Sequence, residues 1–506
     1  MVLPFVRDLF ADVEQLPAFS RVISHLRANT GRLRVSGVNS PAKALLIAEL
    51  QKQLSRPLIV VVNNNETADE LLPVVQAFCE LIGGASADFV VSLPSRDVLP
   101  FQNLSPHPEL QEQRAITLWK VATGAASIVI TPVASSALRL NSPEYYADLA
   151  RTLRRGESFD TTSLLEHLNA VGYNSTDVVE MPGDYALRGG ILDVYSPEAD
   201  RPVRIEFFGD EVESIRKFDP ATQRSSTPAD EVVLLPFSET PVRDQLLGAI
   251  HARLSGKRLS GSEEIIEQAV RAGGVNVFPG WEFYAPVAGS FGTVFDLLPN
   301  AAIIADEPEI LGRELEQFWE RVEEAHERSG IGNLVCPSDL YVSTEEWQNK
   351  VQASPGADIE HLALTRDDTE TIEFHSQPSP RFHGSIPSML EDVKKHLAEN
   401  RRVLIAAPNT GELERLADFF TEYAVSFRLG SRTRGGESYA DETAYFAGEV
   451  LTATLVKSYI PDGVILPEVG LAIFGTRDLF DESESVVSRP QRQKSKTSAF
   501  LSDFRD

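Results

Sequence analysis

Short apolar segments alternate with amphipathic ones over residues 1–138, and this alternation restricts the fold more than any other feature of the sequence. RLRVSG precedes AKALLIAELQKQL, PLIVVVNN precedes DELLPVVQAFCELI, and FVVSLP and ASIVITP follow. Short buried strands separated by helices form parallel sheets that helices cover on both faces. We also expect Thr67 and Glu70 to form a capping box at the second helix. The chain is therefore expected to begin with an α/β domain.

Residues 139–238 have a different character. The segments ILDVY, PVRIEFF and EVESIRKF are separated by the turn signals EADRP and GD. Strands joined by such turns predict a small sheet of hairpin type, inserted here into the α/β domain. That domain is expected to resume over residues 239–349, where the helical segments IHARL and EEIIEQAVRAG precede the buried strand AAIIADEP.

A further α/β domain, of unknown role, is expected over residues 350–480. RRVLIAAPN, VLTATLV and LAIFG are strand-like, and GELERLADFFTEY is helix-like, with Asn409 as its N-cap and Glu412 three positions on. Residues 481–506 are polar and charged, so we expect a linker toward further domains.

Composition excludes several classes of function. A net charge of −27 on 506 residues disfavours nucleic acid as a ligand, because Lys and Arg contacts to phosphate supply most of that affinity. The sequence lacks a run that could span a bilayer and the pattern of a signal peptide, so we expect a soluble cytoplasmic protein that does not bind membranes. Cys79 and Cys336 have no histidine at ligand spacing, so we expect no metal site and place both cysteines in the core.

The stretch SGVNSPAKALL, residues 36–46, looks like a damaged phosphate-binding loop. Gly37 and Lys43 stand where the motif G-x-x-x-x-G-K-[ST] requires them, whereas Ala42 and Ala44 do not. Ala44 lacks the hydroxyl that holds Mg²⁺, and Pro41 removes one N–H group from the phosphate cradle. We expect this loop to bind no nucleotide, and the alternative is an active nucleotide-binding enzyme.

An acidic pair follows a later buried strand, in AAIIADEP. Asp306 and Glu307 have the arrangement of a Walker B element, in which one acid orders the metal and a neighbouring Glu can activate water. The simpler interpretation is a buried strand that ends in a solvated acidic turn. A serine hydrolase is not supported, because AGSFG misses the G-x-S-x-G elbow by its first glycine.

The segment PVRIEFF is the best candidate for a binding surface. Period two places Arg204 and Phe208 on the outer face of a half-buried strand, so one phenylalanine of the pair faces outward. Arg188, in the preceding turn with Gly189 and Gly190, would join them. An exposed aromatic beside arginine is typical of protein-binding hot spots. The alternative is a sheet covered by another part of the chain, with Arg204 paired to an acid.

The same residues resemble two families of bacterial repair proteins. YALRGGILDVYSP at 185–197, RIEFF at 204–208 and the later FDP are similar to the UvrA-binding module shared by UvrB and the transcription-repair coupling factors. VLPFQNLSPH, GWEFYAP and FDLLPNAAIIADE extend the likeness. APNTGELERLADFF and LAIFGTRDLF favour the coupling factors, because UvrB has no such domain there. The damaged loop and the absence of a tyrosine-rich hairpin near residue 100 favour the coupling factors too.

This resemblance implies a fold and a function. The fold would be a degenerate P-loop NTPase-type α/β domain of UvrB type, with an inserted UvrA-binding β domain and a further α/β domain. The chain would be a non-enzymatic, monomeric module without cofactor that recruits UvrA through Arg188, Arg204 and Phe208. The complete family member would be an ATP-dependent DNA translocase of helicase superfamily 2 that uses ATP and Mg²⁺ to displace stalled RNA polymerase from duplex DNA. Its motor and its polymerase-binding domain would lie outside this chain.

Overall fold

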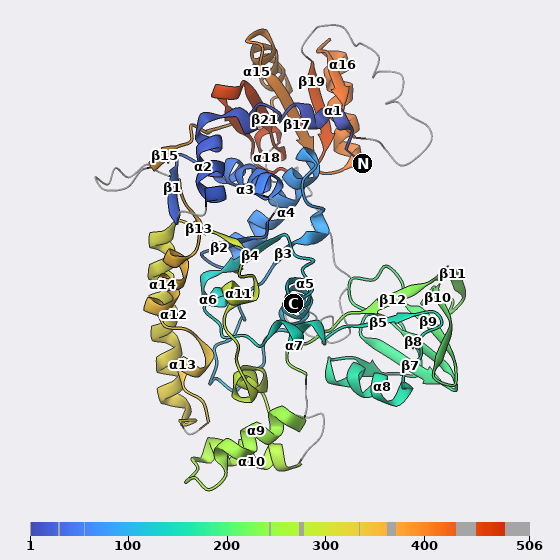
Figure 1. The fold of residues 1–506 in the computed structure, drawn as a ribbon. Coiled ribbons are helices and arrows are strands. Elements are labelled where there is room, and N and C mark those ends of the chain that lie inside the picture. The colour runs from blue at the N-terminus through green and yellow to red at the C-terminus, as the bar shows by residue number, and fades with distance from the viewer. Residues whose placement is uncertain are drawn as a thin grey trace.

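A computed structural model of the chain describes residues 2–28, 31–54, 56–241, 244–272, 278–332, 334–361, 371–431 and 452–480. Within these ranges lie a seven-stranded sheet, two six-stranded sheets and a two-stranded ribbon. Figure 1 shows one six-stranded sheet at the top, the seven-stranded sheet below it, and the other six-stranded sheet projecting to the right. The linker expected over residues 481–506 lies outside the described residues.

The seven-stranded sheet contains only parallel pairings, in the order β15, β1, β14, β13, β2, β4, β3. This confirms the parallel sheet expected from the alternating pattern. Its strands are β1 (Arg32–Ser36), β2 (Leu58–Val62), β3 (Val90–Ser92), β4 (Ile128–Pro132), β13 (Ala302–Asp306), β14 (Gly356–Glu360) and β15 (Thr371–Glu373).

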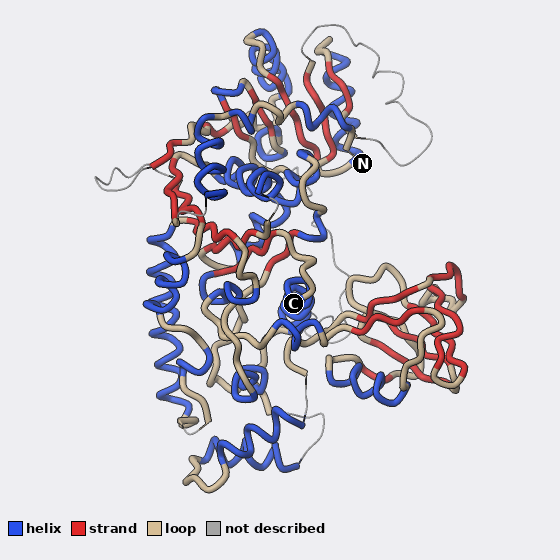
Figure 2. Tube along the Cα trace, in the orientation of Figure 1, coloured by secondary structure: helices blue, strands red, loops and turns tan. Residues whose placement is uncertain are grey.

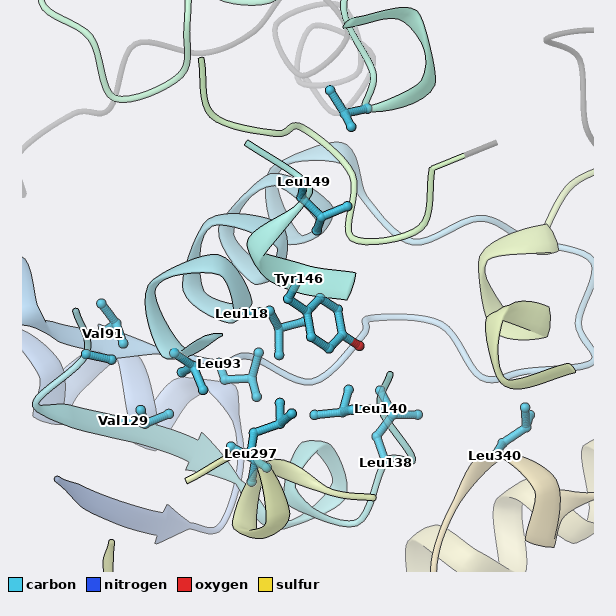
Figure 3. Close-up of a cluster of buried hydrophobic side chains, with 14 of the residues drawn as sticks. Val91, Leu93, Leu118, Val129, Leu138, Leu140, Tyr146, Leu149, Leu297 and Leu340 are labelled. Carbon is cyan, nitrogen blue, oxygen red and sulfur yellow. The ribbon is translucent and has the colours of Figure 1, made fainter. Parts of the chain in front are cut away.

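Successive residues of the central strands enter two cores on opposite faces of this sheet. Ile59 and Val61 join the core that includes residues of α5 (Pro108–Ala122) and α12 (Pro308–Ser329). Val60, between them, joins the core beside α3 (Ser40–Leu54) and α4 (Asn65–Ile82). Figure 3 shows Leu118 of α5 and Tyr146 gathered in the first core. Burial on both faces explains why these strands are apolar throughout.

The start of α4 differs from our expectation. Asn64 is the N-cap, and its side-chain oxygen accepts hydrogen bonds from the N–H and hydroxyl groups of Thr67 at 2.9 and 3.0 Å. The predicted capping box of Thr67 and Glu70 is therefore wrong, because Thr67 already lies inside the helix. The expectation is correct for α16 (Thr410–Glu422), where Asn409 accepts from the Glu412 N–H at 2.9 Å.

Strands β14 and β15 extend the seven-stranded sheet past residue 350, where we expected the next α/β unit to begin. Asp358 and Glu360 of β14 are buried and pair with Arg32 and Arg34 of the neighbouring β1, at 2.5 and 3.3 Å. Because β14 contains these two acidic residues, it does not stand out as an apolar segment in the sequence. The next sheet begins only at β16 (Gln377–Pro378).

The sheet that projects to the right in Figure 1 is mixed, in the order β11, β10, β9, β8, β7, β6. Its pairings are antiparallel except for β6 with β7. A helix, α8 (Thr161–Ala170), accompanies it, and the ribbon of β5 (Arg151–Arg154) and β12 (Glu231–Leu234) connects it to the remaining chain. Its strands are β6 (Asn174–Ser175), β7 (Asp184–Arg188), β8 (Ile191–Val194), β9 (Val203–Phe208), β10 (Glu211–Phe218) and β11 (Ser225–Ala229).

The chain then returns to the first sheet through helices α9 (Asp244–Leu254) and α10 (Gly261–Ala272) and the 3-10 helix η3 (Trp281–Ala288). Helices α9 and α10 lie at the bottom of Figure 1, and α12 runs along the left edge. Short helices complete this part: α1 (Pro4–Asp8), η1 (Val13–Gln15), α2 (Pro17–Ala28), η2 (Ala87–Phe89), α6 (Val133–Ser136), α7 (Pro143–Ala147), α11 (Val294–Leu297), α13 (Pro337–Leu340) and α14 (Thr344–Ala353).

The sheet at the top of Figure 1 has helices α15 (Ile386–Ala398) and α16 packed into one core cluster with its strands. Residues such as Leu404 and Ile473 instead join the core that contains α1, α2 and α3. The N-terminal helices thus lie between the two α/β sheets, as the tube in Figure 2 also shows. The strand order is β16, β20 (Val464–Leu466), β21 (Leu471–Phe474), β17 (Arg402–Ala407), β19 (Ala453–Lys457), β18 (Phe427–Leu429), with η4 (Pro467–Val469) and α18 (Thr476–Leu479) nearby.

The cysteines and the helices test two smaller expectations. Cys79 is buried as predicted, but Cys336 is exposed at the start of α13, so its assignment to the core is wrong. Its Sγ lies 3.3 Å from the Asp339 carboxylate, so the residue belongs to a polar turn at the start of this helix. Among the helices that the structure describes, none is both long and apolar enough to cross a membrane.

Candidate functional site

Two hairpin turns meet at one end of the mixed sheet and present its most exposed aromatic residue. The β7–β8 turn holds Gly189 and Gly190, and the Phe207 N–H of β9 donates to the Gly190 carbonyl at 2.7 Å. A Cβ atom at Gly190 would lie 2.8 Å from the Phe207 carbonyl oxygen, so only glycine allows this approach. The turn is thereby fixed beside Phe208, the last residue of β9.

The side chains at these turns form a small surface that we call the tip patch: Arg188, Ile191, Glu206 and Phe208. Arg188 is opposite Ile191, and Ile191 is opposite Glu206, so they share one face, which Phe208 rejoins two residues after Glu206. Phe208 is 79% exposed and Ile191 is 38% exposed, whereas the neighbouring Ile205 is fully buried. The prediction that one phenylalanine of RIEFF faces outward is confirmed.

Arg204 lies on the same face but is mostly engaged within the sheet. Its Nε and Nη2 donate to the two carboxylate oxygens of Asp193, directly opposite on β8, at 2.7 and 2.8 Å. The guanidinium also stands 4.9 Å from the centre of the Phe218 ring. The hydrogen bond to Asp193 raises the pKa of Arg204 above its ordinary value. The side chain is 21% exposed, so only part of it borders the tip patch.

The damaged loop joins β1 to α3, and its lysine meets the acid of the later strand. Lys43 Nζ donates to Asp306 Oδ1 at 2.5 Å, with the two side chains only 13% and 7% exposed. In a working P-loop site the lysine would contact phosphate and the acid would help to hold Mg²⁺. Here each group neutralises the other. The structure therefore brings together two of the residues that the sequence singled out.

The amide groups of the loop also have internal partners. Asn39 N–H donates to the Ser376 hydroxyl at 3.0 Å, and Ala42 N–H donates to the Asn39 side chain at 3.1 Å. The Lys43 N–H donates to the Asn39 carbonyl at 2.9 Å. In phosphate-binding loops such amides point at the ligand. In this chain these amides are bound to Asn39 of the loop itself and to Ser376 of a distant segment.

Glu307 does not join the site that Lys43 and Asp306 form. Its backbone is left-handed, with φ of 54°, and its carboxylate accepts the His361 N–H at 2.6 Å. Its own N–H donates to the Ile359 carbonyl. Glu307 thus ties the end of β13 to the end of β14. Within the described ranges, no group of three or more His, Cys, Asp or Glu side chains could hold a metal ion.

A buried charge cluster, which the sequence did not reveal, anchors the chain where it leaves the mixed sheet. Glu239 accepts from Arg114 at 2.7 and 3.0 Å and from Arg96 at 2.9 Å. Glu239 and Arg114 are buried, and the Arg96 side chain is only 8% exposed. Burial alone would raise the pKa of the Glu239 carboxyl, but the two guanidinium groups hold that pKa at about 2. Contacts spanning up to 143 residues leave no local pattern to find.

Comparison with known proteins shows what these features are similar to. Residues 152–239, which contain the tip patch and end at Glu239, match the UvrB interaction domain. The chain is 27% identical over 517 residues to a transcription-repair-coupling factor from Myxococcus xanthus, covering 96% of this chain. It is 24% identical over 489 residues to a transcription-repair-coupling factor from Staphylococcus aureus strain bovine RF122 / ET3-1, covering 92% of this chain.

The chain spans only part of these relatives, 42% of the first and 39% of the second. The matched segment nevertheless runs through both α/β sheets and through the mixed sheet that is inserted into the first of them, since it covers nearly the whole chain. The expectation drawn from YALRGGILDVYSP and RIEFF is therefore confirmed as homology to these relatives. This chain is homologous to the N-terminal region of the transcription-repair-coupling factors, and its residues 152–239 match the UvrB interaction domain.

Proposed function

We propose that this chain recruits UvrA in transcription-coupled nucleotide-excision repair and that the tip patch makes the contact. The observation that carries this proposal is Phe208, 79% exposed within residues 152–239, which match the UvrB interaction domain. The relatives are named transcription-repair-coupling factors, a name that links transcription with repair. A module shared by these proteins and UvrB suits a partner that both would meet, and UvrA is that partner by resemblance.

The tip patch has the composition that protein partners bind. Large exposed aromatic residues and arginine dominate the energetics of interfaces when a partner buries them. Phe208 and Ile191 would enter an apolar pocket, while Arg188 would pair with a carboxylate at its rim. Arg204 would contribute its exposed edge, and its bond to Asp193 would hold β8 and β9 in register beneath the patch.

The remaining activities of the family would belong to parts outside this chain. We propose that RNA polymerase and duplex DNA are bound there, and that ATP and Mg²⁺ serve a motor there. In this chain we propose that the damaged loop holds no nucleotide. The Lys43 ion pair with Asp306 and the internal bonds of the loop amides support this. Titration with fluorescent ATP and Mg²⁺ tests it, and saturable binding that Lys43→Met abolishes would contradict it.

Binding of purified UvrA to the immobilised chain tests the proposed contact. We expect Phe208→Ala to weaken binding about thirtyfold, since loss of an aromatic anchor costs roughly 2 kcal/mol. Arg188→Ala should weaken it about fivefold, at roughly 1 kcal/mol. Phe291→Ala is the matched control, because Phe291 is 55% exposed but lies outside residues 152–239.

Arg204→Ala has two effects, because it also leaves Asp193 without its cation. Asp193→Asn separates them: it keeps Arg204 but weakens the bond that holds β8 to β9. Circular dichroism checks that each variant keeps its fold. If each of the three single variants, Phe208→Ala, Arg188→Ala and Arg204→Ala, bound UvrA as tightly as wild type, the proposal would be contradicted.

A further inference from the structure

Three residues, 374–376, connect the two α/β sheets, and we call them the strap. Strand β15 ends the parallel sheet at Glu373, and β16 opens the next sheet at Gln377. With so few residues between the strands, the position of one sheet depends on how the strap is held. The strap lies outside residues 152–239, so any role it has goes beyond the proposed contact with UvrA.

One side of the strap lies against the damaged loop. Phe374 N–H donates to the Ser36 carbonyl at 2.8 Å, which continues the pairing of β15 with β1. The Ser376 hydroxyl accepts from the Asn39 N–H at 3.0 Å and donates to the Gly37 carbonyl at 2.8 Å. A single hydroxyl group thus satisfies both a donor and an acceptor of the loop.

Gly37 is the residue that makes room for the strap. Its φ is +74°, which side chains other than that of glycine rarely adopt. A Cβ atom there would lie 2.5 Å from the Phe374 carbonyl oxygen, which is backbone and cannot rotate away. In this chain the glycine is therefore required by residues 374–376, whereas the motif requires it for phosphate.

The other side of the strap contacts the second α/β sheet. Phe374 is 4% exposed, and it lines a small cavity with Leu466 at the end of β20. His375 Nδ1 lies 2.7 Å from Glu468 Oε1, in η4 immediately after β20. Next along the chain, Gln377 pairs with Ile465 of β20. The strap thus contacts the loop on one side and β20 and η4 on the other.

We propose that the damaged loop is an internal docking site for the strap and that this docking fixes the second α/β sheet against the first. The Ser376 hydroxyl is bonded to the Asn39 N–H and to the Gly37 carbonyl of the loop. Through these bonds the loop holds the strap, and the strap in turn holds the second sheet. Weakening the contact between the loop and the strap, at Gly37 or at Ser376, should therefore also loosen β20 and η4, because these elements contact the other side of the strap.

Hydrogen exchange of the intact chain, measured by mass spectrometry, tests this joint. Ser376→Ala removes both hydroxyl bonds at little steric cost, and Gly37→Ala adds the clash with Phe374. We expect exchange about tenfold faster in residues 36–39 and also in residues 464–469, because local opening exposes the amides of both partners.

Gly124→Ala is the matched control for backbone strain. Gly124 has φ of +72°, and among the described residues nothing lies within 4 Å of a Cβ placed there. This variant should leave residues 464–469 at the wild-type rate. Faster exchange confined to residues 36–39 in Ser376→Ala would overturn the proposal, because the strap would then be a local contact only. If Gly37→Ala fails to fold, Ser376→Ala alone decides between these outcomes.

Discussion

Glu49 of α3 is a buried acid whose replacement makes a quantitative prediction. Its side chain is fully buried, and among the described residues neither carboxylate oxygen has a hydrogen-bond partner. Lys52 Nζ lies 3.8 Å from Glu49 Oε2 but only 2.6 Å from Glu14, which competes for the same cation. Burial, with Glu14 nearby, raises the pKa of Glu49 from 4.5 to about 7, although Lys52 opposes this shift.

The sign of the pH dependence is set by this raised pKa. The folded chain holds the proton of Glu49 more tightly than the unfolded chain, so stability falls as pH rises from 4.5 to about 7. The full difference is 7 − 4.5 pKa units, which at 1.36 kcal/mol per unit amounts to roughly 3 kcal/mol above pH 7. The neutral Glu49→Gln removes this cost without changing the size of the side chain.

Urea unfolding at two pH values isolates the charge of Glu49 from other effects of the substitution. The isoelectric point near 4.8 makes acidic buffers unsuitable, so we choose pH 5.5 and 8.5. Between them the stability of Glu49→Gln relative to wild type should rise by roughly 2 kcal/mol, the share of the linkage that lies in this range. Glu70→Gln, an exposed carboxylate on α4, is the control and should show no such rise. Equal effects of Glu49→Gln at both pH values would refute the reasoning.

Two further predictions concern the other buried charges. Glu239→Gln should destabilise the chain by about 3 kcal/mol at pH 7, because two buried guanidinium groups lose their counter-charge. Since the pKa of Glu239 is lowered from 4.5 to about 2, this stabilisation is fully present above pH 4.5, and urea unfolding at pH 5.5 and 8.5 should show the same loss. Lys43→Met and Asp306→Leu should each destabilise by about 3 kcal/mol, whereas the double variant should lose less than either single one. Additive losses in unfolding experiments would show that the two side chains do not interact.

The sequence predicts the elements whose environment is uniform along the chain. Strands β2, β4 and β13 are buried on both faces, so their apolar runs identify them. Strand β9 is buried on one face, so its alternation places Ile205 inward and Phe208 outward. The family resemblance rests on motifs that are continuous in sequence, such as RIEFF, and these survive in the match to the UvrB interaction domain.

The remaining features depend on contacts between distant residues. Strand β14 carries Asp358 and Glu360, which look like a solvated turn until Arg32 and Arg34 are placed beside them. The partner of Asn39 in the loop is Ser376, 337 residues away. No local period records either contact. The exposed position of Cys336 was missed for a different reason: its partner Asp339 lies only three residues on, and the two residues form the turn that opens α13.

The same long-range contacts decide which cations of this acidic chain are available to a partner. Lys43, Arg114 and Arg204 each lie against a buried carboxylate, so a ligand would have to break an existing bond to use them. Arg188 is exposed, and within the described residues it has no ion-pair partner. An uncompensated guanidinium beside a protruding phenylalanine gives a partner both attraction and apolar area at one point. This is why the tip patch, and not the better-known loop motif, is where binding should occur.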